Sequence, residues 1–304
     1  MKNRSIAIYL SIIWSLLLLA VGWYVYSFYV ERTQQPVISF DAQRAYADVE
    51  TQVAFGPRSP GTDGHNQIRA WIQDEVVAAG WQFEVQETEA LGHPVRNLIA
   101  KNSNDAPQII IGAHYDSRMY ADNDPDPTKQ TQSVPAANDG ASGVAVLLEL
   151  ARSLPRDTIP VWLVFFDAED NGHIEGWDWI LGSREFVKNN PSIKPQAVVV
   201  IDMIGDADLN IYKERNSNAQ ITEDIWATAK GLGYEDKFIP DYKFSMLDDH
   251  TPFLEAGIPA VDLIDFDYPY WHTTGDTPDK VSADSLKAVG DTLRTWIIQQ
   301  SGQN

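Results

Sequence analysis

The feature that most constrains the fold of this chain is a series of short apolar runs, most of which are followed by an Asp or a His. The runs predict strands at residues 97–100, 108–113, 161–167, 197–202, 209–212 and 260–264. Several are continuous stretches of Val, Ile and Leu, a pattern typical of strands that are buried on both faces of a sheet. Such strands need helices on both faces, so we expect a layered α/β structure.

Helical patterns lie between these runs, at residues 42–53, 64–79, 140–153, 177–188, 222–232, 251–256 and 283–300. In the segment that starts at Gly140, the apolar residues Val144, Leu147, Leu148 and Ala151 fall on one helical face. Because strands and helices alternate along the chain, we predict a single α/β domain over residues 40–304. Its central sheet is expected to be mixed but mostly parallel, with helices on its flanks.

A long apolar run near the N-terminus stands apart from this pattern. It extends from residue 6 to residue 30 without a charge, and it follows Lys2 and Arg4. A helix of that length can cross the hydrocarbon core of a bilayer. We predict a cytoplasmic N-terminus at residues 1–5, a single-pass transmembrane signal anchor at 6–30, a linker at 31–39 and an extracytoplasmic domain. The alternative is a cleaved signal peptide, which also places the domain outside the cytoplasm, although no small-residue cleavage site is evident.

The overall composition excludes several classes of function and partner. The formal net charge of -20 argues against binding to nucleic acid, because phosphate groups need Lys and Arg to neutralise them. It is compatible with cationic substrates such as peptides with a free amino terminus. The chain has no cysteine, so disulfides and thiolate sites are excluded. Any metal must therefore be held by His, Asp and Glu.

Ionisable residues cluster after the predicted strands or just before the helices that come next. They are His114, Asp116, Asp139, Asp167, Glu169, Asp170, Asp202, Asp248, Asp249, His250 and His272. The carboxyl ends of parallel strands meet at one edge of an open α/β sheet, where ligands bind. Histidine and carboxylates together suit zinc, and a carboxylate beside the metal can act as a general base. In the pair Glu169 and Asp170, one carboxylate can bind the metal and the other can act as the general base. Trp177 and Trp179 are explained equally well as pocket residues or as packing residues.

Taken singly, these ionisable residues have simpler explanations. Asp139 alone is best explained as a helix cap, and Glu169 and Asp170 could belong to a solvated acidic turn. The joint pattern, however, favours a metal site, in which Asp116 is a candidate partner for orienting His114.

Six segments of the chain form a recognisable ordered set: GAHYDS, ANDGASGVAVLLELAR, VFFDAED, VIDMIGD, DDHTPFLEAGIPAV and WHTTGDTPDKV. Together they resemble the zinc aminopeptidase superfamily, and the resemblance covers nearly all of the chain after Gly56. Within that superfamily the chain looks most like the glutaminyl-peptide cyclotransferases. Asp248 stands where aminopeptidases more often have Ser, and the Trp-His-Thr sequence at Trp271 also matches the cyclotransferases.

This resemblance implies a zinc-dependent enzyme that converts an N-terminal Gln or Glu of a peptide to pyroglutamate, with release of ammonia from Gln. It implies that Asp139, Asp170 and His272 bind one zinc ion and that Glu169 shuttles the proton. The family more often has Glu where this chain has Asp170, and the shorter side chain is still an adequate zinc ligand.

The resemblance also implies that Asp202 and Asp248 form an acidic hydrogen-bond network near the substrate and that Trp271 lines its pocket. The alternative is a zinc metallo-aminopeptidase, which hydrolyses the N-terminal residue of a peptide. In that case His114 and Asp202 would complete a second zinc site, with Asp139 bridging the two ions. The ligand inventory does not separate these two activities.

Overall fold

The computed structural model describes residues 14, 16–24, 26 and 39–302, and the chain divides into two compact units, Met1–Ile38 and Ser39–Asn304. In the first unit the described residues are helical and exposed. A search of the described residues finds no helix with the length and apolar character needed to cross a membrane. The predicted cytoplasmic end at residues 1–5, much of the predicted anchor at 6–30 and nearly all of the predicted linker at 31–39 lie outside the described residues.

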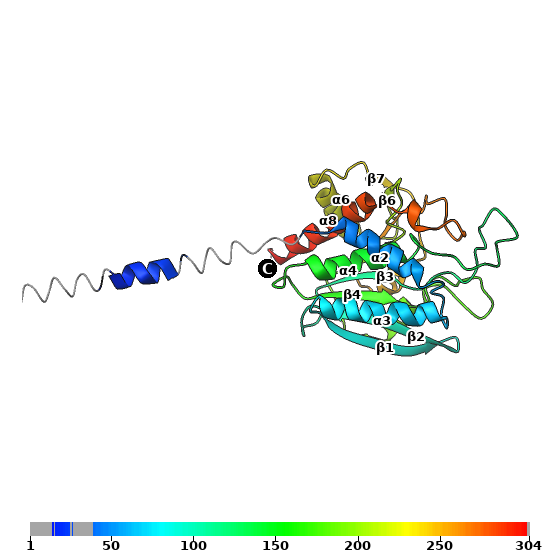
Figure 1. Ribbon diagram of the computed structural model, residues 1–304, viewed down its shortest axis with the longest axis horizontal. Helices are drawn as coiled ribbons and strands as arrows, with labels where there is room; N and C mark the ends of the chain where they lie inside the picture. The colour runs from blue at the N-terminus through cyan, green and yellow to red at the C-terminus, as the bar shows by residue number, and fades with distance from the viewer. Residues whose placement is uncertain (1–13, 15, 25, 27–38, 303–304) are drawn as a thin grey trace, which may run out of the picture. The chain divides into compact units, whose positions relative to one another are not determined.

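The second unit is built around a six-stranded sheet in the order β1-β2-β4-β3-β5-β8 (Figure 1). Its strands are β1 (Gln82–Ala90), β2 (His93–Lys101), β3 (Ile109–His114), β4 (Val161–Phe166), β5 (Ala197–Asp202) and β8 (Ala260–Ile264). Strands β4, β3, β5 and β8 are parallel, whereas β2 is antiparallel to both of its neighbours. This confirms the predicted single α/β domain with a mixed, mostly parallel sheet.

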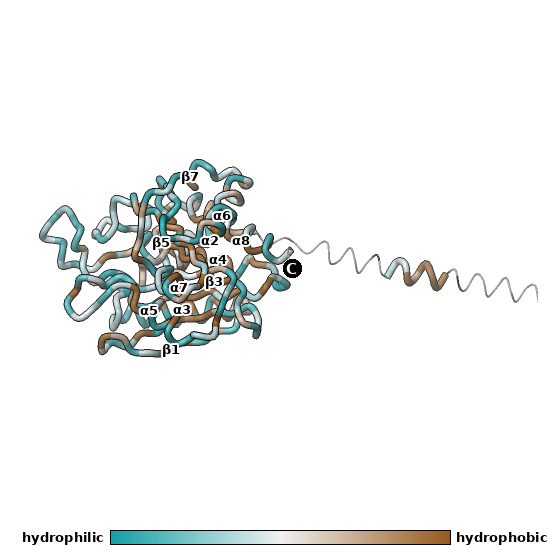
Figure 2. The backbone as a smooth tube through the Cα atoms, turned by 180° about the vertical axis from the view of Figure 1, so that it is seen from behind, coloured by the Kyte–Doolittle hydropathy of each residue, from teal (hydrophilic) through white to brown (hydrophobic). Residues whose placement is uncertain are grey.

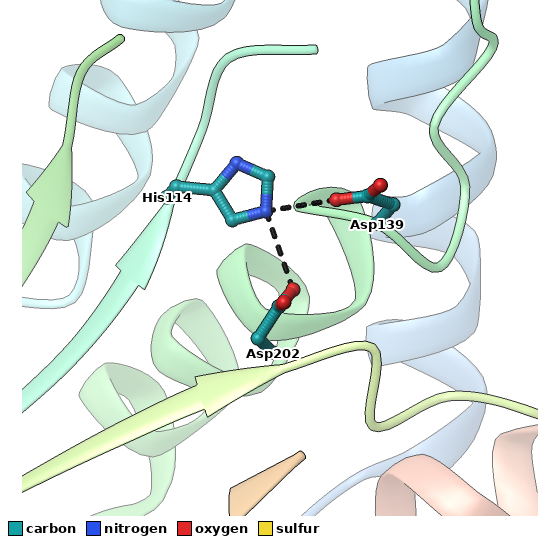
Figure 3. Close-up of side chains that lie close together, drawn as sticks. All are labelled: His114, Asp139 and Asp202. Atoms are coloured by element: carbon teal, nitrogen blue, oxygen red, sulfur yellow. Dashed lines mark hydrogen bonds and ion pairs between the residues drawn. The ribbon is translucent and has the colours of Figure 1, made fainter. Parts of the chain in front are cut away.

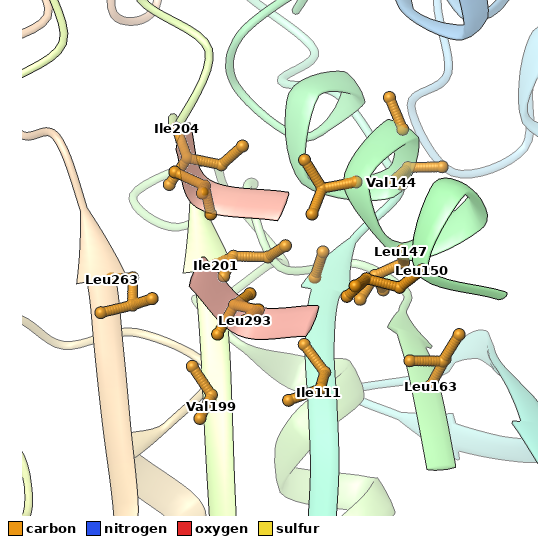
Figure 4. Close-up of a cluster of buried hydrophobic side chains, with 14 of the residues drawn as sticks. Ile111, Val144, Leu147, Leu150, Leu163, Val199, Ile201, Ile204, Leu263 and Leu293 are labelled. Atoms are coloured by element: carbon orange, nitrogen blue, oxygen red, sulfur yellow. The ribbon is translucent and has the colours of Figure 1, made fainter. Parts of the chain in front are cut away.

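Helices cover both faces of this sheet. One face packs with α2 (Ala42–Ala54), α3 (Asp63–Ala78), α4 (Ala141–Ser153), α6 (Ala219–Gly231) and α8 (Ala283–Ser301), and the other with α5 (Leu181–Asn189) and α7 (Thr251–Glu255). Alternate residues of each buried strand face opposite layers, as the pleat requires. Ile111 and Val199 thus join the first layer, with Leu147 of α4 (Figure 4), whereas Ile110 and Val198 join the second.

The predicted strands and helices are all present, with boundary shifts of up to four residues. Two strands are not predicted by the sequence, namely β1 and β7 (Phe238–Tyr242). The latter pairs in parallel with β6 (Ile211–Lys213) outside the main sheet. Both β1 and β7 are largely exposed or half-exposed, so polar residues break the apolar signal. In Figure 2 the hydrophobic segments accordingly gather at the centre of the domain.

One predicted helix starts later than expected. The predicted start at residue 177 is wrong, because α5 begins at Leu181 and Ile180 before it has a left-handed backbone with φ of 55°. Trp179 instead forms an isolated β-bridge with Asp170. The segment between them is therefore a folded loop above the sheet edge rather than a helical turn.

Candidate metal centre and its pocket

Several of the clustered ionisable residues come from the carboxyl edge of the parallel strands. His114 is the last residue of β3, and Asp202 is the last residue of β5. Glu169 and Asp170 follow the end of β4, which lies beside β3. Because the sheet holds these strand ends in parallel register, residues far apart in the sequence are brought to one edge.

Three of these residues meet at one imidazole nitrogen. His114 Nε2 lies 3.1 Å from Asp139 Oδ1 and 3.3 Å from Asp202 Oδ1. Figure 3 shows the imidazole at the end of β3, with the two carboxylates approaching from the turn before α4 and from the end of β5. His114 and Asp139 are each only 2% exposed. This group is called the His114 triad.

A second group shares Asp139 and is called the His272 triad. His272 Nε2 lies 2.8 Å from Asp170 Oδ1 and 3.7 Å from Asp139 Oδ2. All three residues are buried. Asp139 thus turns one oxygen toward His114 and the other toward His272, so it stands between the two triads.

Both triads fit a metal ion by the arrangement of their donor atoms. In each, one ligand atom per residue lies within 4.8 Å of the others. In the His272 triad the buried Asp139 Oδ2 and Asp170 Oδ2 have no hydrogen-bond partner among the described residues. Buried carboxylate oxygens without a donor are unfavourable, and a dication would satisfy both. One His and two carboxylates form the nitrogen and oxygen ligand set that catalytic zinc sites use.

Burial perturbs the carboxylates at this edge. Burial, together with the charge of Asp139, raises the pKa of Asp170 to about 6, and burial raises the pKa of Asp202 to about 7. Burial and then the neighbouring Asp170 charge raise the pKa of Glu169 well above its ordinary value, although His114 opposes the shift. Several carboxylates in one buried site therefore resist full ionisation unless a cation joins them.

Glu169 is held in place by the backbone that carries it. Its amide N–H donates to Asp116 Oδ1 at 3.0 Å, and the N–H of Asp170 donates to Asp116 Oδ2 at 3.3 Å. Asp116 Oδ1 also lies 3.5 Å from His114 Nδ1. The carboxylate that the sequence offers as a partner for His114 therefore also fixes the turn that bears Glu169.

The turn that carries Asp139 depends on a distant carboxylate and on a glycine. Asp276 accepts hydrogen bonds from the backbone N–H of Asn138 at 2.8 Å and of Asp139 at 3.1 Å. Gly140 has φ of 95°, and an added Cβ would lie 2.9 Å from His114 Cε1. A larger residue at position 140 would therefore both strain the backbone and displace the imidazole.

A cavity of about 200 Å³ opens beside the His272 triad. Its walls combine carboxylates with large apolar side chains: Asp139, Glu169, Asp170, Trp179, Asp202, Met203, Met246, Leu247, Asp248, Ile264, Phe266 and Trp271. The Trp179 ring stacks near His272, with 5.9 Å between centroids and 15° between planes. Trp177 lies against His93 instead, at 3.7 Å. Only the first of these two tryptophans lines the described cavity.

The structure brings together the residues to which the family resemblance assigns a role in the site, whereas Asp167 is instead bonded to His65 at 2.7 Å. His114 belongs to the His114 triad. The other seven line the cavity or supply an atom of the His272 triad at its edge: Glu169, Asp248, Asp202, Trp271, Asp139, Asp170 and His272. Sequence patterns do not identify Met246, Leu247 or Phe266 as cavity residues. These lie in loops whose path depends on tertiary packing, and they carry no chemical signal of their own.

Comparisons with known proteins agree with this architecture. A model of Peptidase family M28 matches residues 97–297 of the chain. The crystal structure of a glutaminyl cyclase from Tannerella forsythia is similar, with a TM-score of 0.80 and 35% identity over 86% of this chain and 99% of that chain. A Zn-dependent exopeptidase from Parabacteroides distasonis also has a TM-score of 0.80, with 33% identity over the same shares. The glutaminyl-peptide cyclotransferase of Bos taurus is 24% identical over 289 residues, which cover 80% of this chain and 78% of that protein.

Proposed function

This chain belongs to peptidase family M28, and from that premise we propose that it is a zinc-dependent glutaminyl-peptide cyclotransferase. It is an enzyme of the kind that includes glutaminyl cyclases and Zn-dependent exopeptidases. The proposed substrate is a peptide or protein that begins with Gln or Glu. From a Gln peptide the products are a pyroglutamyl peptide and ammonia.

The observation that carries the proposal is the buried carboxylate of Asp248. It lines the same cavity as Glu169 and is 4% exposed. Within the described part of the chain, no N–H or hydroxyl donor reaches its Oδ2 atom. A substrate carboxamide would supply such a donor through its NH₂ group, which would offset the cost of the unpaired oxygen. In peptide hydrolysis by water, no carboxamide of this kind takes part in the reaction.

Cyclisation forms a bond between the α-amine nitrogen of the substrate and the γ-carbon of its Gln side chain. It then breaks the bond from that carbon to the amide nitrogen, which leaves as ammonia. Glu169 takes the proton from the attacking amine and returns it to the leaving nitrogen. Burial raises the pKa of Glu169 well above its ordinary value, which suits a group that must hold a proton between two steps. The reaction consumes no water.

Zinc is the proposed cofactor, and Asp139, Asp170 and His272 are its proposed ligands. When bound, zinc would polarise the γ-carbonyl of the substrate. The unpaired Oδ2 atoms of Asp139 and Asp170 support this assignment. Both atoms belong to carboxylates of the His272 triad.

The remaining cavity residues position the substrate. Asp248 would hold the carboxamide nitrogen, and Asp202 would extend the acidic network behind it. Trp271 and Trp179 are the aromatic walls of the cavity, and their rings would exclude water from the reacting amine. These roles are supported by the positions of the side chains, because each lines the same cavity as Glu169.

A second candidate function is a zinc metallo-aminopeptidase, and the His114 triad favours it. His114, Asp139 and Asp202 meet the same distance criterion as the first ligand set. With two zinc ions and Asp139 between them, Glu169 would take a proton from the water that attacks the first peptide bond. The two activities therefore use one set of residues and differ in metal count and in the attacking group.

Mass spectrometry of two matched peptides tests the proposal. The zinc-loaded full-length protein is incubated with a Gln-initiated peptide and with the same peptide initiated by Leu. We expect loss of ammonia from the Gln peptide and no change in the Leu peptide. Release of the first residue from the Leu peptide would instead establish the aminopeptidase, and a Glu169→Gln variant controls for contaminating enzymes in either case.

We also propose that residues 6–30 anchor the protein in a membrane with the catalytic domain on the extracytoplasmic side. The support is the uncharged apolar run that follows Lys2 and Arg4. The measurement is extraction of membranes from expressing cells. Retention of the protein after carbonate washing and its release by detergent are expected, whereas recovery in the wash would contradict the anchor.

A further inference from the structure

Arg118 is a buried cation next to the proposed zinc ligands. Its side chain is only 2% exposed. Its Nη1 donates to the carbonyl oxygen of Asp170 at 3.1 Å, and its Nη2 donates to the carbonyl oxygen of Gly172 at 3.2 Å. The same guanidinium lies over the Trp179 ring, 5.0 Å from its centroid. One side chain therefore contacts both the loop that carries Asp170 and an aromatic wall of the cavity.

Arg118 also donates hydrogen bonds to both carboxylate oxygens of Asp122. Nε donates to Oδ1 at 2.7 Å and Nη2 donates to Oδ2 at 2.5 Å, the two-pronged geometry that fixes a carboxylate most firmly. Asp122 Oδ1 lies 3.6 Å from His272 Nδ1. That nitrogen is on the opposite side of the imidazole from Nε2, which faces Asp170 and Asp139.

The loop that carries Asp122 also holds the backbone around His272. The N–H of Asn123 donates to the carbonyl oxygen of His272 at 3.1 Å. Asp124 Oδ2 accepts the N–H of Thr274 at 3.0 Å and its hydroxyl at 2.6 Å. His272 itself has φ of 55°, a left-handed conformation that a non-glycine residue adopts only when its surroundings enforce it.

We propose that the Arg118–Asp122 pair positions His272 for metal binding, with Asp122 as the acceptor for the Nδ1–H group of the imidazole. A histidine that binds a metal through one nitrogen commonly donates its other N–H to a carboxylate, which fixes the tautomer and the ring orientation. The 3.6 Å separation is longer than a direct hydrogen bond, so the proposal requires the imidazole to turn toward Asp122. Arg118 keeps Asp122 at that place, because it grips both oxygens.

The arrangement links the metal site to the substrate pocket. Arg118 connects Asp122, the carbonyl of Asp170 and the Trp179 ring through one planar group. Asp122 would therefore affect metal binding alone, through His272. Arg118 would affect metal binding through Asp122 and substrate binding through Trp179. If Arg118 only satisfied buried carbonyls, its replacement would destabilise the fold, and the variants of Arg118 and Asp122 would not differ in their effects on zinc binding and on KM.

The inference rests on the proposed zinc site, and it is tested first without any substrate. Zinc affinity of the full-length protein is measured by competition with a chromophoric chelator, and the Co²⁺-substituted protein is examined by absorption spectroscopy. Asp122→Asn is the test variant. Asp126→Asn is the matched control, since Asp126 lies in the same loop and its side-chain carboxylate accepts from Thr128, away from His272.

We expect Asp122→Asn to weaken zinc binding about 10- to 100-fold and to alter the Co²⁺ spectrum, because its loss frees the imidazole to rotate. The control should bind zinc as the unchanged protein does. Asp122→Glu, which keeps the charge, should recover part of the lost affinity. Unchanged zinc affinity and an unchanged Co²⁺ spectrum in Asp122→Asn would overturn the proposal.

Arg118→Lys provides the second variant and uses enzyme kinetics. Lysine keeps the charge but cannot grip both oxygens of Asp122 or stack on Trp179 as a plane. We expect weaker zinc binding together with a raised KM, whereas Asp122→Asn should lower kcat at saturating zinc with little change in KM. The same KM and zinc affinity as the unchanged protein would contradict the role of Arg118. If no Gln peptide is cyclised at all, the proposed function fails, while the zinc titrations still decide the role of Asp122.

Discussion

The His114 and His272 triads contain the same types of ligand but differ in how far they are already satisfied. In the His114 triad, one imidazole nitrogen lies within 3.3 Å of two carboxylates. Burial alone would lower the pKa of His114, but the neighbouring carboxylates of Asp116, Asp139 and Asp202 raise it well above its ordinary value. The charge of a protonated His114 would offset only part of the negative charge of these carboxylates. In the His272 triad, Asp139 Oδ2 and Asp170 Oδ2 have no donor among the described residues, so this triad has the greater need of a cation.

The two triads are also supported in different ways. His114 and Asp202 end regular strands, so the ladders of β3 and β5 fix them. His272 lies in a loop, with a left-handed backbone, and depends on the Asp122–Asp124 segment and on Arg118. Ala168, which precedes Glu169, also has a left-handed backbone with φ of 51°. Conformations of this kind are maintained at functional sites by the structure around them. The His114 triad is thus held more firmly by the sheet, but the His272 triad has the greater need of a cation. Rigid support by the sheet and strong metal binding are therefore separate properties.

The largest expected effect comes from replacing the histidine of the second triad. His272→Ala should abolish zinc binding at the tighter site and reduce turnover by more than the 10- to 100-fold that a supporting residue typically contributes. The physical reason is that two carboxylates would remain without the nitrogen ligand that completes the set. Zinc titration and kcat measurement on a Gln-initiated peptide provide the check.

His93→Ala is the control for this variant, because His93 stacks on Trp177 outside the cavity. It should bind zinc as the unchanged protein does. Full zinc affinity in His272→Ala would show that the comparison between the triads is wrong.

The next effect concerns Glu169, whose Oε2 atom lies 4.0 Å from His114 Nδ1. Glu169→Gln keeps the shape of the side chain but removes its ability to accept a proton. We expect kcat to fall about 10²- to 10⁴-fold, the usual contribution of a general base, while zinc affinity changes little. Turnover close to that of the unchanged protein would remove Glu169 from the proposed mechanism, and loss of zinc would make it a ligand instead.

A smaller effect is expected from His114→Ala. If the enzyme is a cyclotransferase with one zinc ion, this variant should retain the tight site, and its kcat should fall by about tenfold or less through the altered charge around Asp139. Zinc stoichiometry and turnover of the Gln peptide are measured together. Loss of a second tightly bound zinc ion along with all activity would support the aminopeptidase. It would also show that the His114 triad needs a cation as much as the His272 triad does.

The sequence predicts the sheet-based part of this site better than the loop-based part. His114 and Asp202 are identifiable because each ends an apolar run, and a parallel sheet brings such ends together. The order β1-β2-β4-β3-β5-β8 is not evident from the runs, since β1 is a polar edge strand. The roles of Arg118 and Asp122 are also not evident, because they depend on a contact with His272 more than 140 residues away in sequence. Local patterns contain no record of such contacts.

The smallest effect addresses the two tryptophans that the sequence leaves undecided. Trp179 lines the cavity, stacks near His272 and lies under Arg118, whereas Trp177 packs on His93. Trp179→Phe should therefore weaken substrate binding by about 1 kcal/mol, or about fivefold in kcat/KM, because a smaller ring gives up apolar contact and part of the cation–π attraction. Trp177→Phe is the matched control and should leave kcat/KM unchanged. Equal losses in both variants would mean that the loop contributes through its packing alone. A loss confined to Trp179→Phe would mean that the aromatic wall belongs to the His272 side of the site, where the structure places the greater need for a cation.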